Sequence, residues 1–266
     1  MLRSTKEMDG YDVAAIDGDI GQVKDFYFDD ATWVVRYLIV DTGSWLSSRK
    51  VLISPISIEQ INGPERTLPV KITRDQVKGS PEIDTDKPVS RQHEERYLGY
   101  YGYPFYWGGI GLWGEGMNPI MAMPGLPGFV SSSKDDAEGH RVIAKARAAA
   151  HRDDDPHLRS CNAVAGYHVH ANDGEIGHVE GMLIDDETWS VRYLIVNTSN
   201  WWLGHSVLVA PQWIKHMSWT DATVSVDMSL EAIKRAPPYD PLEVLLRQKE
   251  IDTYQHHGRS AYWPPR

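Results

Sequence analysis

The sequence predicts a mainly β protein made of two small β-barrels in tandem, each followed by a short helix and a helical or extended tail. The first observation behind this prediction is an internal repeat: Leu2–Thr42 aligns with Leu158–Thr198 without a gap, at a constant offset of 156 residues. The second is that apolar runs in each copy are short and are separated by turn residues, which is typical of strands. A sheet this small has costly edges, so we expect it to close into a barrel.

The repeat continues beyond the predicted strands. In the same register Arg91 aligns with Arg247, and the pair Tyr106-Trp107 aligns with Tyr262-Trp263. We therefore divide the chain into four parts. They are a first barrel at 1–84, a tail and an aromatic Gly/Pro-rich linker at 85–157, a second barrel at 158–240 and a C-terminal tail at 241–266.

Within the first copy, strands are expected at 11–16, 20–29 and 33–42, with further strands through 50–61 and at 67–73. Asp17-Gly18 is a turn signal, because glycine accepts positive φ, and Gly21 indicates a bulge. The run 33–42 is β-branched and aromatic, so we expect it to be the most buried strand. The second copy repeats this pattern.

A hydroxyl residue stands before the short helix predicted in each copy, Thr73 in the first and Ser229 in the second. Such a residue caps a helix N-terminus by accepting backbone hydrogen bonds. The tails that follow are long enough for amphipathic helices. We expect each tail to pack across its barrel.

Composition excludes several function classes. A net charge of -10 and a pI near 5.5 disfavour direct nucleic-acid binding, which depends on Lys and Arg. Cys161 is the single cysteine, so no intrachain disulfide or thiolate-rich metal site is expected. The N-terminal sequence has no apolar leader or membrane span, which predicts a cytoplasmic protein that could still be peripheral to the inner membrane.

Gly109, Gly111 and Gly114 have the spacing of a dinucleotide-binding loop, but no strand precedes them and prolines follow, so no cofactor site is predicted. From Tyr97 to Val130 the only charged residue is Glu115, while Tyr, Trp, Gly and Met abound. This stretch could pack between the barrels, bind a partner or touch a membrane surface. The sequence leaves these alternatives open.

The segment "DGDIGQVKDFYFDDATWVVRYLIVDT" with the later "VLISP" resembles the PRC-barrel domain, and "DGEIGHVEGMLIDDETWSVRYLIVNT" with "VLVAP" resembles it again. The family takes its name from the photosynthetic reaction centre H subunit. The resemblance implies a bacterial, noncatalytic adaptor or assembly module. The alternative is an accessory subunit of a photosynthetic or other electron-transfer complex, and an enzyme with an unrecognised site is the third possibility.

An arginine lies inside the most apolar strand of each copy, where a guanidinium needs a carboxylate partner. The predicted partners are acidic residues of the preceding turn. These pairs would brace the turn or, alternatively, dock an acidic group of a partner. The residues concerned are Arg36 with Asp29 and Asp30, and Arg192 with Asp185 and Asp186.

Aromatic residues give the predicted protein-contact surface, because tryptophan and tyrosine are enriched at interface hot spots. They are Trp45, Trp201, Trp202, Tyr106 and Trp107. The alternation of His168 and His170 supplies too few ligands for zinc, and no catalytic motif is found. We therefore predict no metal, cofactor or catalytic residue, an unidentified protein partner that could belong to a membrane-surface complex, and leave a homodimer open.

Overall fold

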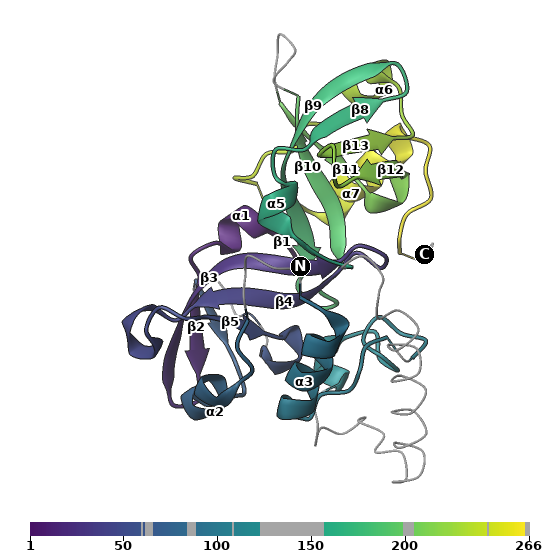
Figure 1. Cartoon of the computed structure of the whole chain (residues 1–266). Coiled ribbons are helices and arrows are strands. Elements are labelled where there is room, and N and C mark those ends of the chain that lie inside the picture. The colour runs from purple at the N-terminus through teal and green to yellow at the C-terminus, as the bar shows by residue number, and fades with distance from the viewer. Residues whose placement is uncertain are drawn as a thin grey trace. The chain divides into compact units, whose positions relative to one another are not determined.

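The computed structural model describes residues 1–59, 61, 66–83, 89–107, 109–122, 157–198, 205–243 and 245–263. These residues form two compact units. Unit 1 contains Met1, residues 7–160 and the turn 185–190, and unit 2 contains residues 2–6, 161–184 and 191–266. Both units are mainly β, as the sequence predicts (Figure 1).

The sheet of unit 1 has the order β5-β4-β3-β2-β6, and β7 pairs with the end of β3, at Tyr27, Phe28 and Asp29. All pairs are antiparallel except β2 with β6. The strands are β2 (Asp12–Ala15), β3 (Gly18–Asp29), β4 (Val34–Asp41), β5 (Lys50–Ile53), β6 (Thr67–Pro69) and β7 (Leu158–Ser160).

The sheet of unit 2 has the matching order β11-β10-β9-β8-β13-β12, and β1 pairs with β9. Its parallel pair is β8 with β13, which corresponds to β2 with β6 in unit 1. The strands are β1 (Leu2–Ser4), β8 (His168–Ala171), β9 (Gly174–Asp185), β10 (Val191–Asn197), β11 (Ser206–Val209), β12 (Ile214–Ser218) and β13 (Thr223–Val226).

Among the described residues of unit 1, the strand ladder does not run unbroken from β5 round to β6. In unit 1 the described edge strands β5 and β6 are linked through the chain that follows β5, where Ile58 forms an isolated bridge with Val70. The connection that follows β5 begins with a 3-10 helix, η2 (Pro55–Ser57). The edges are therefore brought together by a connection and one bridge rather than by a continuous ladder.

Short helices follow each sheet, as predicted. Thr73 accepts a hydrogen bond from the Gln76 amide at the start of α2 (Arg74–Gly79), and Ser229 does the same for the Ala232 amide at α6 (Leu230–Lys234). Each tail then forms a longer helix. The remaining helices are α1 (Thr5–Met8), α3 (Arg91–Tyr101), α5 (Cys161–Val164), α7 (Arg247–His256) and the 3-10 helices η1 (Gly43–Leu46), η3 (Pro119–Ala122) and η4 (Pro211–Trp213).

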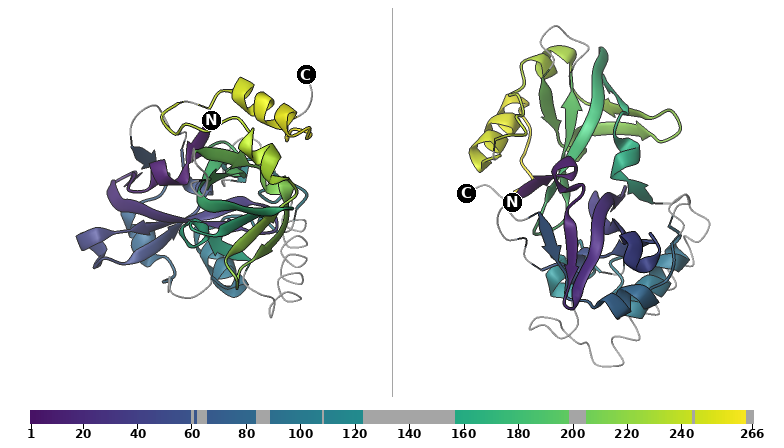
Figure 2. Two further views of the ribbon diagram at one scale, coloured as in Figure 1. Left: turned by 90° about the horizontal axis from the view of Figure 1, so that it is seen from above. Right: turned by 90° about the vertical axis from the view of Figure 1, so that its left-hand side faces the viewer.

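Both tail helices pack on the sheet of their own unit. Tyr97 of α3 forms an edge-to-face ring contact with Tyr37 of β4, and Tyr254 of α7 does so with Tyr193 of β10. Figure 2 shows α7 as the yellow helix beside the green strands of unit 2. The expectation that the tails lie across the sheets is confirmed.

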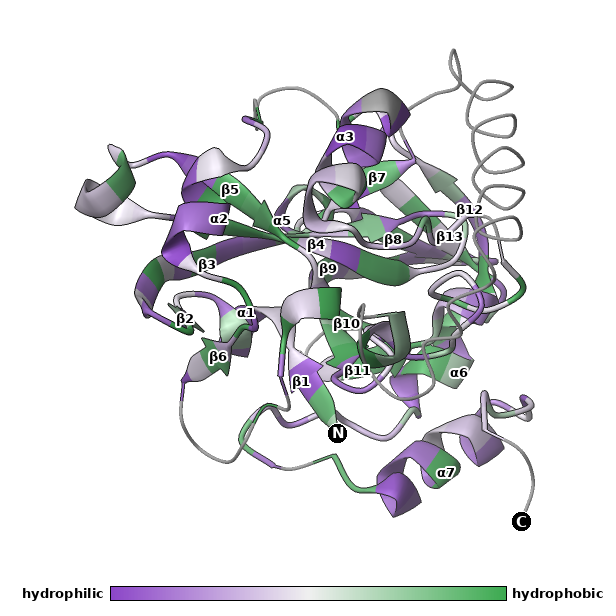
Figure 3. Cartoon of the chain, turned by 90° about the horizontal axis from the view of Figure 1, so that it is seen from below, coloured by the Kyte–Doolittle hydropathy of each residue, from purple (hydrophilic) through white to green (hydrophobic). Residues whose placement is uncertain are grey.

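The most buried strand of each unit is the predicted one. Every residue of β4 from Val34 to Val40 is buried, and β10 differs only at Arg192, which is partly exposed. In Figure 3 β10 and β5 are coloured as hydrophobic, whereas α3 and α7 are largely hydrophilic. The core therefore sits on the central strands, and the helices contribute single apolar side chains to it.

The glycine of each bulge is required by a close backbone approach. A Cβ on Gly21 would lie 1.9 Å from the Asp41 carbonyl oxygen, and one on Gly177 would lie 2.0 Å from that of Asn197. The register of β2 and β3 shifts next to Gly21, as a bulge requires. The preceding turn is displaced by one residue from the prediction, since Ala15 pairs with Gly18 and leaves Ile16 and Asp17 as the turn residues.

Candidate functional site

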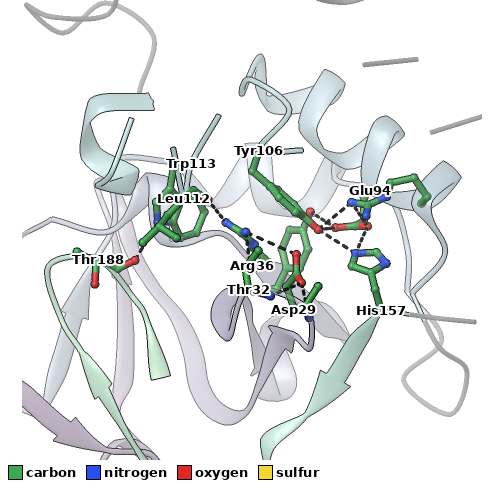
Figure 4. A network of polar contacts seen from close by, with 12 residues as sticks. Asp29, Thr32, Arg36, Glu94, Tyr106, Leu112, Trp113, His157 and Thr188 are labelled. Atoms are coloured by element: carbon green, nitrogen blue, oxygen red, sulfur yellow. Dashed lines mark hydrogen bonds and ion pairs between the residues drawn. The ribbon is translucent and has the colours of Figure 1, made fainter. Parts of the chain in front are cut away.

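A buried carboxylate holds the first tail to the sheet of unit 1. Glu94 of α3 is 0% exposed, and it accepts hydrogen bonds from the hydroxyls of Tyr37 (3.2 Å) and Tyr106. Arg91 lies 3.2 Å and His157 3.1 Å from its second oxygen. Figure 4 shows Tyr106 and His157 converging on the Glu94 carboxylate. An ionised carboxylate is costly to bury unless it is paired in this way.

Arg36 of β4 lies beside the same cluster. Its guanidinium stacks over the Tyr106 ring at 3.8 Å and lies 4.9 Å from the Trp113 ring. It donates hydrogen bonds to the Leu112 carbonyl and to the Thr32 hydroxyl, the latter at 3.1 Å (Figure 4). The charge is thus buried against two rings and two oxygen acceptors.

The buried position changes the acidity of these groups. Burial lowers the pKa of Arg36, and the nearby Tyr106 and Asp29 counteract only part of that effect. Burial, together with the charge of Glu94, raises the pKa of Tyr37 and of Tyr106 well above the ordinary tyrosine range. Both phenols are therefore protonated donors to the Glu94 carboxylate at neutral pH.

Asp29 is the predicted partner of Arg36, and the structure brings the two together. Its Oδ2 lies 3.6 Å from the guanidinium, while its Oδ1 accepts hydrogen bonds from the amides of Ala31 and Thr32. The same turn places Trp33 in the left-handed region, with φ 56°. Asp29 therefore braces the turn with one oxygen and faces the arginine with the other.

The other predicted acidic residues have different partners. Asp30 accepts a hydrogen bond from Arg159 Nε at 2.8 Å, and Asp186 pairs with the amino group of Met1. Asp185 belongs to unit 1, where it accepts a hydrogen bond from the Glu187 amide at 3.0 Å. Asp30 thus pairs with β7 and not with Arg36, because β7 is the neighbour of β3 at this point.

Unit 2 repeats the carboxylate cluster at the same offset of 156 residues. Glu250 of α7 accepts hydrogen bonds from Tyr193 and Tyr262, both at 2.8 Å, and Arg247 lies 2.8 Å away. Arg192, the counterpart of Arg36, lies 4.2 Å from the Tyr262 ring. The arrangement of one carboxylate, two tyrosines and two arginines is therefore common to both units.

Sequence reasoning aligned Arg91 with Arg247 and Tyr106 with Tyr262, but missed the two glutamates and the two strand tyrosines. The repeat register contains the signal, since Glu94 aligns with Glu250 and Tyr37 with Tyr193. A glutamate in a helix rich in charges is normally a surface residue, so its type alone does not indicate burial.

The structure describes two of the four tryptophans that were predicted to contact a partner, Trp45 and Trp107. Trp45 is partly buried, donates a hydrogen bond from its indole to the Ile20 carbonyl and lies 4.3 Å from the Arg74 guanidinium. Trp107 is half-buried and stacks on Phe105 at 4.8 Å. Trp201 and Trp202 lie outside the described residues.

Tyr106 is not a surface residue, so the prediction that it contacts a partner is corrected. It is 5% exposed and its hydroxyl is shared by Glu94, Arg91 and His157. The Arg36 guanidinium stacks over its ring. Tyr106 anchors the tail because it satisfies buried charges that would otherwise lack partners.

Residues 109–122 of unit 1, here called the covering segment, follow that anchor. Trp113 is 2% exposed and donates a hydrogen bond from its indole to the Thr188 carbonyl at 2.9 Å. The segment closes on itself through the bridges Gly111–Gly114 and Trp113–Gly116. Gly109 and Gly111 allow this tight backbone packing, since a Cβ on either would meet backbone atoms at 2.1 to 2.3 Å.

Large apolar side chains of the covering segment remain exposed. Ile110 is 98% exposed, and three more apolar residues near the end of the segment are at least 42% exposed. They are Met117, Ile120 and Met121. The segment is thus fixed by buried anchors and presents apolar side chains outward, an arrangement suited to contact with another surface.

Among the described residues no group of three or more His, Cys, Asp or Glu side chains is placed to hold a metal ion. Within the same ranges, none of the helices has the length and apolar character needed to cross a bilayer.

Comparison with known proteins bears on the first repeat. A search of curated proteins finds no match to the chain. The family model that does match is that of the PRC-barrel domain, over residues 3–77. This range covers the strands of the first repeat up to helix α2, and the second repeat has the same strand order and register. Residues 3–77 of this chain are therefore a PRC-barrel domain.

Proposed function

We propose that the protein is a noncatalytic adaptor or assembly module that binds another protein through the covering segment of unit 1. The observation that carries this proposal is the combination of buried anchors and exposed apolar side chains in one short segment. Trp113 is 2% exposed while Ile110 is 98% exposed. A backbone that is already fixed loses little entropy on binding, and the exposed isoleucine and methionine side chains bury apolar area.

The chemistry of the segment supports an apolar protein partner. Glu115 is its only charged residue, although the chain as a whole has a net charge of -10. A contact made by such a segment depends on apolar area and little on ion pairs, so it should resist salt. The buried glutamates support a noncatalytic role, since Glu94 and Glu250 are 0% and 3% exposed and serve to fix the tails.

The test is affinity capture from native cells with a matched pair of variants, read by quantitative mass spectrometry. One variant carries Ile110→Ser and Ile120→Ser in the covering segment. The control carries Leu242→Ser and Leu246→Ser, since these leucines of unit 2 are also exposed, at 93% and 61%. We expect one stoichiometric, salt-resistant partner that the first variant loses and the control retains.

Equal capture by both variants would contradict the proposal. Binding of the purified chain to phosphatidylglycerol vesicles, abolished by the same Ile110→Ser and Ile120→Ser changes, would instead assign the segment to a membrane surface. Recovery of electron-transfer subunits as the partner would refine the adaptor into an accessory subunit of such a complex.

A further inference from the structure

The leading strands of the two repeats are exchanged between the two sheets. β1 belongs to the first repeat but pairs with β9 in unit 2, and β7 belongs to the second repeat but pairs with β3 in unit 1. Both strands have the sequence Leu-Arg-Ser. Each sheet is therefore completed by the strand of the other repeat rather than by its own.

In unit 2 the incoming segment is held by side chains as well as by strand pairing. Lys6 Nζ lies 3.0 Å from Glu180 Oε1, and the Thr5 hydroxyl accepts a hydrogen bond from the Met182 amide at 3.2 Å. The segment also passes close to Gly181, where a Cβ would make an ordinary contact with the Thr5 hydroxyl oxygen at 3.5 Å. The edge of β9 thus offers Lys6 a carboxylate and Thr5 an amide donor.

The Glu180 carboxylate is well suited to this contact. Partial burial alone would raise its pKa, but hydrogen bonds from Lys6 and Ser206 outweigh burial and lower the pKa. Ser206 donates at 2.8 Å from β11. Ser206 thus binds Oε2 of Glu180 and leaves Oε1 to Lys6.

The matching contacts in unit 1 are of a different kind. Arg159 Nε donates to Asp30 at 2.8 Å, and the Ser160 hydroxyl donates to Asp25 Oδ2 at 2.5 Å. Asp25 aligns with Gly181, so the Ser160 contact has no counterpart in unit 2. The two strand edges therefore have different side-chain requirements, although the strands themselves are alike.

Charge explains why β1 does not complete its own sheet. Glu180 aligns with Lys24 in the first repeat. If β1 paired with β3 in the same register, Lys6 would face Lys24 instead of a carboxylate. Like charges at such a position are unfavourable, so the exchanged pairing is the one that the sequence selects.

We propose that the β9 edge from Glu180 to Met182 is a specific binding site for the first residues of this chain, and that a second copy can supply them. The contacts are backbone pairing, one hydroxyl and one ion pair, and none needs the donor strand to be part of the same chain. Exchange of an identical element between copies is a general route to dimers.

The direct test uses unmodified full-length protein. Copies with natural and heavy isotopes are mixed and treated with a carbodiimide, which joins an amine to a carboxylate without a spacer. We expect Lys6–Glu180 links within one chain at low concentration, and links between light and heavy copies whose share grows with concentration. Links confined to single chains at every concentration, or no link of this pair, would overturn the proposal.

A second test measures specificity. The chain lacking residues 1–6 should bind a fluorescent peptide of residues 1–8, and should bind the peptide with Lys6→Glu about threefold to tenfold more weakly, as loss of an exposed ion pair and a new repulsion require. Glu180→Lys in the acceptor should restore binding of the altered peptide. Equal affinity for both peptides would contradict the charge selection.

If the shortened chain does not fold, the full chain carries the same test. Lys6→Glu and Glu180→Lys alone should each increase hydrogen exchange at the Met182 amide by about threefold, and the double variant should return it to the original rate. Exchange that is unchanged in the single variants would overturn the assignment of this edge.

Discussion

Unit 1 and unit 2 fix their tails with the same cluster, but they bury it to different depths. Arg36 in unit 1 has a 2% exposed side chain, whereas Arg192 in unit 2 is partly exposed. Arg91 is likewise more covered than Arg247, with side-chain exposures of 18% and 50%. The difference shows which part of the arrangement is shared and which part belongs to unit 1.

The additional burial in unit 1 comes with additional partners. The covering segment places the Leu112 carbonyl and the Trp113 ring against Arg36, and His157 adds a contact to Glu94. A charge moved deeper into a protein needs more acceptors and rings to offset its lost hydration. The shared cluster thus anchors a tail, and in unit 1 the covering segment packs on that anchor.

The largest expected effect is loss of a carboxylate charge. Glu94→Gln keeps the shape of the side chain but leaves Arg91 and Arg36 with less compensating charge, and should cost unit 1 about 3 kcal/mol. Glu250→Gln should cost unit 2 less than half as much, because water reaches Arg247. Hydrogen exchange at the Tyr37 and Tyr193 amides measures each unit separately, and equal losses would contradict the comparison.

The bulge glycines should show no such difference. Gly21→Ala and Gly177→Ala would each bring a Cβ against a carbonyl oxygen at about the same distance, 1.9 and 2.0 Å. With φ at 154° and 155°, both positions are also strained for any other residue. We expect losses of about 2 to 3 kcal/mol in both units. A clear inequality in urea unfolding would show that the two sheets are less alike than their pairing indicates.

The tyrosine hydroxyls sharpen the comparison further. Tyr106→Phe and Tyr262→Phe each remove one hydrogen bond to a carboxylate, a loss of about 1.5 to 3 kcal/mol when the acceptor stays buried. The effect should be larger for Tyr106, since water can replace the hydroxyl in the more open cluster of unit 2. Thermal unfolding with local exchange measurements decides the order, and a larger loss for Tyr262 would reverse the interpretation.

The smallest expected effect is a pH dependence of unit 2. Burial, with His256 and Arg259 nearby, lowers the pKa of His257 to about 4. An unfolded histidine titrates near 6.5, so the folded state binds the proton more weakly. The resulting stability is fully present above about pH 6.5 and is lost as the pH falls toward 4. Partial exposure of the ring reduces the size of this loss.

The repeat itself supplies the matched variant for this prediction. Tyr101 occupies the position in the first repeat that His257 occupies in the second. His257→Tyr should therefore flatten the pH dependence of unfolding of unit 2 between pH 6.5 and 4, measured by urea titration. A slope that remains after the substitution would assign the pH dependence to other groups.

Much of the fold could be predicted from the sequence because local signals agree with it. The capping residues Thr73 and Ser229, the bulge at Gly21 and the buried strand at 34–41 each follow from residue type and spacing. The strand exchange could not be predicted, since Leu-Arg-Ser is identical in β1 and β7 and satisfies either sheet. The residues that distinguish the two pairings, Lys24 against Glu180 and Asp25 against Gly181, lie in β3 and β9 and not in the exchanged strands.

The site was harder to predict for a related reason. Arg36 needed a partner, and the turn supplied Asp29, but the Leu112 carbonyl lies 76 residues away and no local pattern links the two. Glu94 and Tyr106 became partners only when the tail folded back on the sheet. Contacts of this kind depend on chain folding over long separations, which periodicity and spacing do not encode.

The central claim is that partner binding belongs to the covering segment of unit 1. Benzoylphenylalanine placed at Ile110, or in a separate chain at Leu242, gives two photoreactive groups of similar exposure, 98% and 93%, on the two units. On irradiation in native cells, the account predicts one dominant protein adduct from position 110 and none of comparable yield from position 242. Equal adducts from both positions, or adducts from position 242 alone, would contradict it.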